Sequence, residues 1–290
     1  MSLSKADYQF FLDLVRKKSA IVLDEGKQSM VESRLTPLLF QHNIPSPEAL
    51  VLRLKAQPHG ELHDLVLDVL ATHETLFFRD GKPFELLRNK LLPELIEKRQ
   101  IERKIRIWSG ACSTGQEPYS VAMMIRQHFP SLNAWKVEIL ATDVSGYMIE
   151  KAANGYYTKA QLARGMPPDM LARFFEKADD LWRIKPDMRK SIEFRTMNLA
   201  DKWDLKGKYD LILLRYVLIY FDMETRREIL KKVLGCLSDD GYLLAGTAEG
   251  SIGSQPGLES VLVDKTLFYR VAAKPAFHTS LNPHSSKDKV

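Results

Sequence analysis

From residue 105 onward, short apolar segments of β-strand character alternate with segments of helical periodicity. The strand-like segments read IRIW, VEILATD, SIEFRTM, YDLILLRYVLI, GYLLAGT and TLFYRV, and the helical ones EPYSVAMMIRQHF, SGYMIEKAANG and METRREILKKVLGCL. This alternation predicts an α/β fold with a mostly parallel sheet covered by helices on both faces. The last strand follows the short Gly253–Gly257 loop closely, so it can enter the sheet antiparallel.

The segments before residue 105 have a different pattern. Residues 1–70 show apolar side chains at helical spacing, which predicts a small all-α domain. Residues 71–104 are interpreted as a linker with a basic helix that begins near Pro83 and extends to about Arg99. Residues 105–273 form the predicted α/β domain. The last segment, 274–290, lacks a periodic apolar pattern and is predicted to be a disordered tail.

Composition limits the class of protein. Two cysteines among 290 residues are too few for a disulfide framework, and no Cys/His cluster has the spacing of a metal site, so no metal is expected. The longest apolar run, 211–221, contains Arg215 and is too short to cross a bilayer. The first residues lack the apolar core of a signal peptide. We therefore expect a cytoplasmic protein that does not insert into membranes.

The net charge of +5 is unevenly distributed. Residues 79–106 hold nine lysines and arginines against five acids, whereas residues 1–70 hold eight against nine. One interpretation is a solvated helix face with mixed ion pairs. The other is an electropositive surface, within about Arg88 to Arg106, that attracts an acidic partner.

The segment RIWSGACSTGQEPYS, residues 106–120, places a loop of small residues between a predicted strand and a predicted helix. A phosphate-binding loop would have lysine and serine or threonine after its second glycine, but Gln116 and Glu117 stand there. The spacing also differs from the G-x-G-x-x-G of dinucleotide sites. An acid in this loop suits a cationic, hydroxyl-rich ligand without phosphate, such as S-adenosylmethionine.

A second acid supports the same ligand. VEILATD ends in Asp143, one strand–helix–strand step after the loop, where a carboxylate can accept hydrogen bonds from both ribose hydroxyls. The alternative is that Asp143 only caps the following helix.

Six motifs together resemble the chemotaxis receptor methyltransferases: THETLFFR, WSGACSTGQEPYS, ATDVS, Asn198–Leu199, LLRYVLIYFD and DGYLLAGTAE. The resemblance extends from about residue 5 to 271. It implies transfer of methyl groups from S-adenosylmethionine to receptor glutamates, with S-adenosylhomocysteine as product. It also implies a Rossmann-like methyltransferase domain, with a small β-subdomain inserted at about 155–195, preceded by a small all-α domain.

The resemblance also implies a set of site residues. The expected cofactor-binding residues are His73, Thr75, Arg79, Glu117, Asp143, Asn198, Leu199, Arg215 and Tyr216. Tyr220 and Arg79 are expected nearest the reacting centre. Arg79 can pair with the methionine carboxylate of the cofactor, Glu117 can accept its ammonium, and Asn198 with the Leu199 backbone can contact its adenine.

Two of these positions, His73 and Tyr216, usually hold asparagine in relatives. Histidine keeps one hydrogen-bonding function. Tyrosine is larger and lacks the amide, so Tyr216 could instead be a core aromatic on a buried strand. Tyr220 could likewise be a strand-end residue that packs on the next helix.

The implied chemistry needs few catalytic groups. A glutamate side chain is already ionised near neutral pH, so it attacks the methyl group without a general base. Catalysis then depends on alignment and on the exclusion of water. Cys112 is interpreted as a small buried residue rather than a nucleophile.

The partners implied are the cytoplasmic methylation helices of chemoreceptors, with no nucleic acid and a monomeric enzyme. The family's receptor-contacting helix matches KQSMVESRLTPLLFQHN, which keeps Lys27 and Arg34. The matching β-subdomain hairpin, FFEKADDLWRIKP, lacks glycine, so no binding of a receptor C-terminal pentapeptide is expected. The alternatives are a methyltransferase for RNA or a small molecule, and a non-catalytic regulator that has kept the fold.

Overall fold

The computed structural model describes residues 3–24, 26–57, 59–249, 252 and 255–272. The predicted disordered tail, 274–290, lies outside the described residues. Within the described residues, no helix combines the length and apolar character that crossing a bilayer requires.

Four helices form the N-terminal domain: α1 (Lys5–Ser19), α2 (Gln28–Gln41), α3 (Pro47–Ala56) and α4 (Glu61–Leu70). The Ser46 side chain caps α3, where Pro47 occupies the first turn and needs no hydrogen-bond acceptor for its nitrogen. The apolar faces of the four helices meet in one core that contains Phe11, Leu35 and Leu50. This core is separate from those of the sheet domain.

The linker helix is interrupted. It comprises α5 (Lys82–Leu86), the π-helical turn η1 (Leu87–Leu91) and α6 (Leu92–Lys98). The Leu92 N–H donates to the Leu87 carbonyl, and Pro93, which follows, has no N–H to donate. The predicted helix from near Pro83 to about Arg99 is thus confirmed, with its end at Lys98, whereas Arg106, at the end of the basic stretch, lies on a strand.

The large sheet has seven strands in the order β6–β2–β1–β7–β8–β10–β9. The first five in that order are parallel, and β10 pairs antiparallel with β8 and β9. The antiparallel last strand matches the sequence prediction. The bounds are β1 (Lys104–Gly110), β2 (Lys136–Asp143), β6 (Ile192–Thr196), β7 (Tyr209–Leu214), β8 (Leu237–Ala245), β9 (Leu258–Val263) and β10 (Thr266–Val271).

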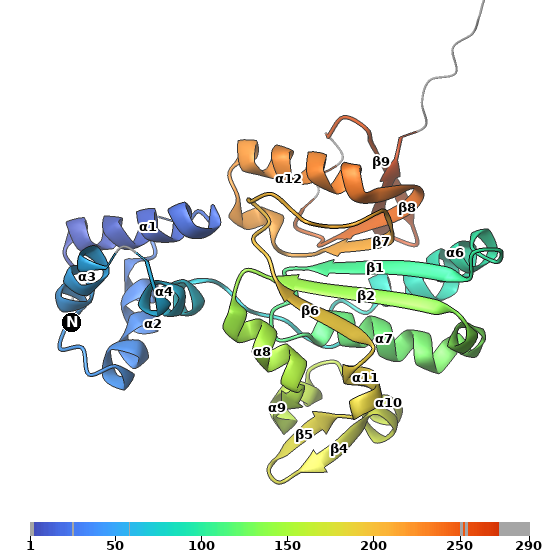
Figure 1. Cartoon of the computed structure of the whole chain (residues 1–290), viewed down its shortest axis with the longest axis horizontal. Helices are drawn as coiled ribbons and strands as arrows, with labels where there is room; N and C mark the ends of the chain where they lie inside the picture. Colours follow the sequence, from blue (N-terminus) through green and yellow to red (C-terminus); the bar gives the residue numbers. More distant parts are fainter. Residues whose placement is uncertain (1–2, 25, 58, 250–251, 253–254, 273–290) are drawn as a thin grey trace, which may run out of the picture.

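Helices cover both faces of this sheet (Figure 1). The core on one face includes residues of α7 and of the linker helices, and the core on the other includes residues of α12. All six residues of β7 are buried, which explains its continuous apolar sequence. The covering elements are α7 (Gln116–His128), η2 (Pro130–Ala134), α8 (Gly146–Asn154), η3 (Leu218–Tyr220) and α12 (Met223–Cys236).

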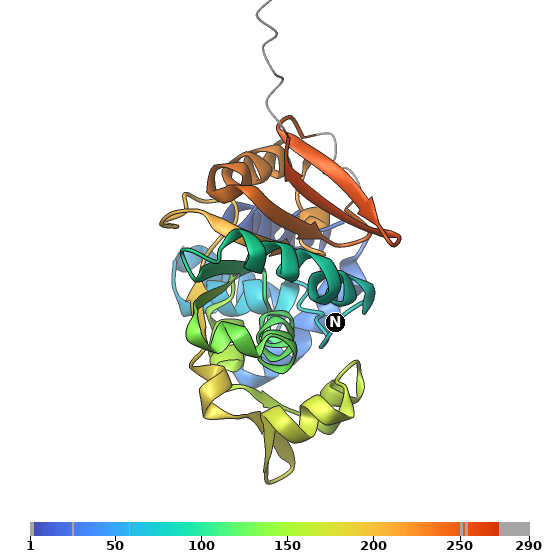
Figure 2. The same cartoon turned by 90° about the vertical axis from the view of Figure 1, so that its right-hand side faces the viewer.

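The insert after α8 forms a second, three-stranded sheet in the order β3–β5–β4. It lies at the opposite end of the domain from the β9–β10 hairpin (Figure 2). Its elements are β3 (Tyr156–Tyr157), α9 (Lys159–Ala163), α10 (Pro168–Phe174), β4 (Phe175–Ala178), β5 (Leu181–Ile184) and α11 (Pro186–Arg189). The buried Tyr157 hydroxyl donates to the Thr114 carbonyl at 2.6 Å, which joins the insert to the loop after β1.

Candidate active site

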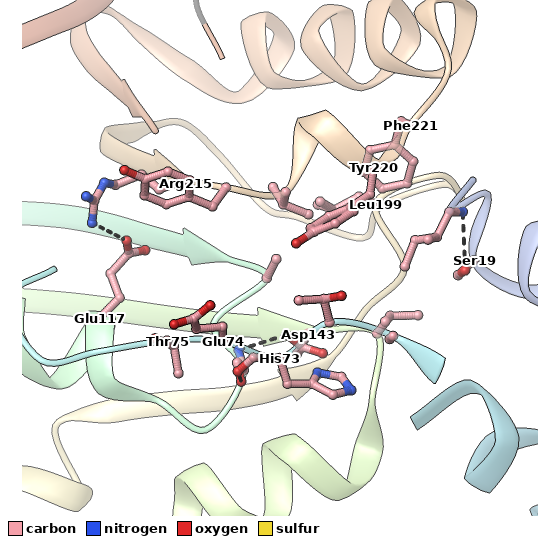
Figure 3. A pocket seen from close by; sticks show the side chains of 18 of the residues that line it. Ser19, His73, Glu74, Thr75, Glu117, Asp143, Leu199, Arg215, Tyr220 and Phe221 are labelled. Carbon is pink, nitrogen blue, oxygen red and sulfur yellow. Dashed lines mark hydrogen bonds and ion pairs between the residues drawn. The ribbon is translucent and has the colours of Figure 1, made fainter. Parts of the chain in front are cut away.

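The carboxyl ends of the parallel strands face the N-terminal domain (Figure 1). A cavity of about 870 Å³ lies between them (Figure 3). This is the edge at which open α/β sheets bind ligands. All ten predicted site residues line this one cavity: His73, Thr75, Arg79, Glu117, Asp143, Asn198, Leu199, Arg215, Tyr216 and Tyr220. The structure therefore brings the whole predicted set together, whereas their individual roles stay predictions.

The loop between β1 and α7 is shaped by unusual backbone conformations. Ala111 and Ser113 adopt left-handed φ values of 56° and 50°. Gly115 has a φ of 89°, and a Cβ there would lie 2.9 Å from the Ala152 side chain. This conformation turns the Ser113 N–H toward Asp143, at 2.8 Å from its carboxylate.

Glu117, in the first turn of α7, is held by two neighbours. One of its oxygens accepts from the Ser109 hydroxyl at 2.8 Å, and the other accepts from Arg215 Nη1 at 3.1 Å (Figure 3). Arg215 is buried and also forms an ion pair with Asp80 at 2.5 Å. A carboxylate has about four acceptor positions, so Glu117 keeps capacity for a ligand cation.

Asp143 ends β2 with its side chain only 5% exposed. Its two oxygens accept from the backbone N–H groups of Ser113 and Ser145 at 2.8 and 3.0 Å. Burial raises the pKa of Asp143, and the two hydrogen bonds partly oppose this. The helix-cap alternative is wrong, because the Ser145 hydroxyl caps α8.

The linker supplies His73, Thr75 and Arg79. The His73 imidazole contacts the Asp68 carbonyl at 2.8 Å, and the His73 carbonyl accepts from the Ser113 hydroxyl. The Arg79 guanidinium stacks on the Tyr216 ring, with its central carbon 3.7 Å from the ring centroid. Arg79 is thus held flat beside the cavity.

Tyr216 follows β7 rather than lying within it. It is half-buried and has a φ of 59°, an uncommon conformation for a large side chain. Its hydroxyl donates to Asp80 at 2.6 Å and lies 3.1 Å from the Thr247 hydroxyl. The interpretation of Tyr216 as a core aromatic on a buried strand is therefore wrong.

The other end of the cavity is closed by the N-terminal domain, where Ser19 lies opposite Glu117 and Arg215 (Figure 3). The Asn198 amide nitrogen donates to the Lys18 carbonyl at 3.0 Å, and the Tyr220 carbonyl accepts from the Val22 N–H at 2.8 Å. The Asn198 amide is thus bound by protein in this structure, and its contact with adenine stays a prediction.

Sequence reasoning assigned no role to Glu249, which follows β8. Its buried carboxylate accepts the backbone N–H groups of Tyr216, Val217, Leu218 and Gly246 at 2.6–2.9 Å. These bonds fix the turn that carries Tyr216. Burial raises the pKa of Glu249, whereas the four hydrogen bonds oppose this. The sequence signal that could have identified Glu249 is its position in GTAE, directly after a predicted strand.

Burial also raises the pKa of the Cys112 thiol well above its usual value. The thiol is therefore protonated at neutral pH, which supports its interpretation as a small buried residue rather than a nucleophile.

Two family models match this chain. The model described as "CheR methyltransferase, SAM binding domain" matches residues 73–265, and "CheR methyltransferase, all-alpha domain" matches residues 6–70. The chain belongs to the CheR methyltransferase family. It is 41% identical to "Chemotaxis protein methyltransferase 1" of Pseudomonas aeruginosa, over 93% of this chain and 99% of that protein. It is 39% identical to "Chemotaxis protein methyltransferase Cher2" of Pseudomonas putida, over 93% and 99%.

The cavity of this CheR methyltransferase fits S-adenosylmethionine (SAM), the cofactor of the family. Asp143 is buried and has no cationic partner among the described residues. Its carboxylate therefore suits hydrogen-bond donors such as the ribose hydroxyls of SAM. Within the same described part of the chain, the buried Arg215 Nε has no hydrogen-bond partner. The carboxylates of Glu117 and Asp143 come from separate elements and line one cavity without an adjacent phosphate-binding lysine. When bound, the cofactor supplies an activated methyl group on a sulfonium.

Proposed function

We propose that this methyltransferase esterifies glutamate side chains of chemoreceptors with methyl groups from SAM, and so supports sensory adaptation. The observation that carries this proposal is the lining of the cavity. It combines the carboxylates of Glu74, Glu117 and Asp143 and the imidazole of His73 with no lysine or cysteine, among the described lining residues, that could serve as a general base. A carboxylate acceptor is the substrate that needs no such base.

The roles of the nearest side chains follow from their contacts. Arg79 donates to the Glu74 carbonyl through Nη1 and stacks on Tyr216, so its orientation is fixed before a ligand binds. Its remaining N–H groups can hold a carboxylate of the cofactor or the substrate. Tyr220 lines the cavity and its backbone is held by Val22, so its hydroxyl can orient the incoming carboxylate. These residues act through alignment rather than proton transfer.

The chemoreceptor assignment is supported by the relatives named as chemotaxis protein methyltransferases. We propose that the enzyme acts as a monomer in the cytoplasm, on the cytoplasmic methylation helices of receptors and not on nucleic acid. We also propose that it does so without a receptor C-terminal pentapeptide. The β4–β5 hairpin supports this, because it turns through Asp179 and Asp180 and contains no glycine.

Methyl transfer from SAM with a tritiated methyl group tests the proposal. We expect label in the receptor that is released by mild base, as a methyl ester is. Label that survives base, or that enters RNA or a small molecule, would contradict the glutamate assignment. A chain that binds neither SAM nor S-adenosylhomocysteine in calorimetry would be a regulator and not an enzyme. Tight binding of the free pentapeptide would contradict pentapeptide independence alone.

A further inference from the structure

A second cavity, of about 980 Å³, adjoins the cofactor cavity. It lies between the start of the linker helix, the end of β8 and the start of β10. The residues that matter for its function are Asp80, Lys82, Gly246, Thr247, Lys265 and Tyr269. We call it the Lys82–Lys265 groove.

Tyr216 separates the two cavities. Its side chain lines the cofactor cavity, while its hydroxyl contacts Asp80 and Thr247, which line the groove. The N-terminal domain closes the opposite end of the cofactor cavity at Ser19. A substrate that approaches the methyl group beside Arg79 and Tyr216 therefore passes next to the groove.

The rim of the groove is positively charged. Lys82 and Lys265 are exposed, and neither forms an ion pair within the described part of the chain. Asp80, the acid among the lining residues, pairs with the buried Arg215, which also pairs with Glu117. The two exposed lysines are the cations that remain for a partner, beside the exposed carboxylate of Asp264.

The backbone that presents Lys265 is unusual. Asp264 and Lys265 form the two-residue turn between β9 and β10, and both are left-handed, with φ values of 48° and 64°. Such turns favour asparagine, aspartate or glycine, so a lysine here carries a conformational cost. On the floor of the groove, the buried Tyr269 hydroxyl has no hydrogen-bond partner among the described residues.

Two other basic candidates, Arg34 and Arg99, are engaged elsewhere in the protein. Arg34 of α2 donates to the Leu70 and Ala71 carbonyls and is used within its own domain. Arg99, after α6, is paired with Asp210 and Asp240 at the amino ends of β7 and β8, the opposite edge of the sheet. Arg99 is therefore not available to attract the receptor, and the role of the rest of the 88–106 stretch stays a prediction.

We propose that the Lys82–Lys265 groove binds acidic side chains of the protein substrate that flank the glutamate to be methylated. This inference rests on the proposed function and names a substrate-binding surface for it. The groove is positive, open and separated from the methyl-transfer site by one side chain, so an acidic segment on it would place a neighbouring carboxylate beside Arg79.

The test compares wild type with the double variant Lys82→Glu/Lys265→Glu, using receptor methylation rates at increasing receptor concentration. We expect the receptor KM to rise on the order of tenfold at low salt, with kcat nearly unchanged. The difference should shrink at high salt, because the charges on the rim are exposed. The neutral variant Lys82→Gln/Lys265→Gln should give a smaller rise. SAM affinity by calorimetry should stay unchanged, which shows that the fold and the cofactor cavity are intact.

The matched control is Lys159→Glu/Lys231→Glu, which reverses two exposed lysines on α9 and α12, away from the groove. An unchanged receptor KM in the groove variant, or an equal rise in the control, would overturn the inference while wild-type methylation still supports the proposed function. Absence of base-labile receptor label in the wild type would instead overturn the proposed function itself.

Discussion

Two buried aspartates lie at opposite edges of the same sheet and have different surroundings. Asp143 ends β2 beside the cofactor cavity, and Asp210 is near the start of β7; each is 5% exposed. Asp210 is paired with the Arg99 guanidinium at 2.8 Å and accepts from the Arg106 N–H. Asp143 accepts two backbone N–H groups, and the structure describes no ion pair for it.

The difference shows how the fold divides its charges between stability and function. At the amino edge, acids and bases neutralise one another within the protein. At the carboxyl edge, Asp143 has no cationic partner among the described residues, and its raised pKa reflects the cost of burying a carboxylate. Left-handed residues also collect there, at Ala111, Ser113 and Tyr216. Such local costs are typical of sites arranged for a ligand.

The largest effect is expected for Asp143→Asn. The amide has one acceptor oxygen instead of two and no charge, so it can no longer serve both N–H groups and the ribose hydroxyls. We expect SAM affinity to fall about 100-fold, or about 3 kcal/mol, in calorimetric titration. Stability should change less, because the pKa of Asp143 is raised in the folded state. A raised folded-state pKa means that the Asp143 carboxyl group contributes less to the free energy of unfolding as pH rises through that pKa. The neutral amide of the Asp143→Asn variant does not titrate, so the variant does not lose stability in this way. Unchanged affinity would contradict the ribose assignment.

Asp210→Asn is the matched counterpart at the other edge. Loss of the carboxylate leaves the partly buried Arg99 with only Asp240 as an ionic partner. We expect the free energy of unfolding to fall by about 2 kcal/mol, measured by urea denaturation, with SAM affinity unchanged. A loss of affinity equal to that of Asp143→Asn would show that the two edges are not functionally distinct.

The residues at the carboxyl edge could largely be predicted from the sequence, because they follow from the local pattern of strands and helices. Alternating strands and helices determine the sheet, and parallel strands place their last residues at one edge, so Glu117 and Asp143 had to approach each other. The ion pairs at the other edge could not be predicted. Arg99 and Asp210 are 111 positions apart, and nothing in either segment indicates the partner.

The same reason explains the errors within the site. The Tyr216 conformation depends on Glu249, which belongs to another strand end, and on Asp80 from the linker. A buried apolar run before Tyr216 suggested that the strand continued through it. The linker helix was predicted close to its observed bounds, but charge patterns do not reveal the π-helical turn before Pro93 or the ion pairs of Arg99.

Glu249→Gln tests whether the carboxyl edge depends on this cross-strand anchor. Each oxygen of the Glu249 carboxylate accepts two backbone N–H groups. In the glutamine variant an NH₂ group replaces one oxygen, so two of these backbone donors would face another donor instead of an acceptor. We expect a loss of about 1.5 kcal/mol in SAM binding, roughly tenfold, with a matching change in the fluorescence or chemical shift of Tyr216. Since Glu249 is a positioning residue, Glu249→Asp should recover part of the affinity. Full affinity in Glu249→Gln would show that the turn is held by other contacts.

The smallest effect is expected at the amino edge for Glu138→Gln. Hydrogen bonds from Lys136, Lys104 and Arg106 lower the pKa of Glu138 to about 2, against partial burial. A depressed folded-state pKa means that the stabilisation is present above the unfolded value and is lost as pH falls toward 2. Because this network is partly exposed, we expect a loss of only about 0.5 kcal/mol at neutral pH, shrinking between pH 4.5 and 2 in urea denaturation. SAM affinity should be unaffected, because charges that are neutralised within the protein at this edge are not available to the cavity at the other. A Glu138→Gln variant that weakens SAM binding would show that the two edges are coupled through β2.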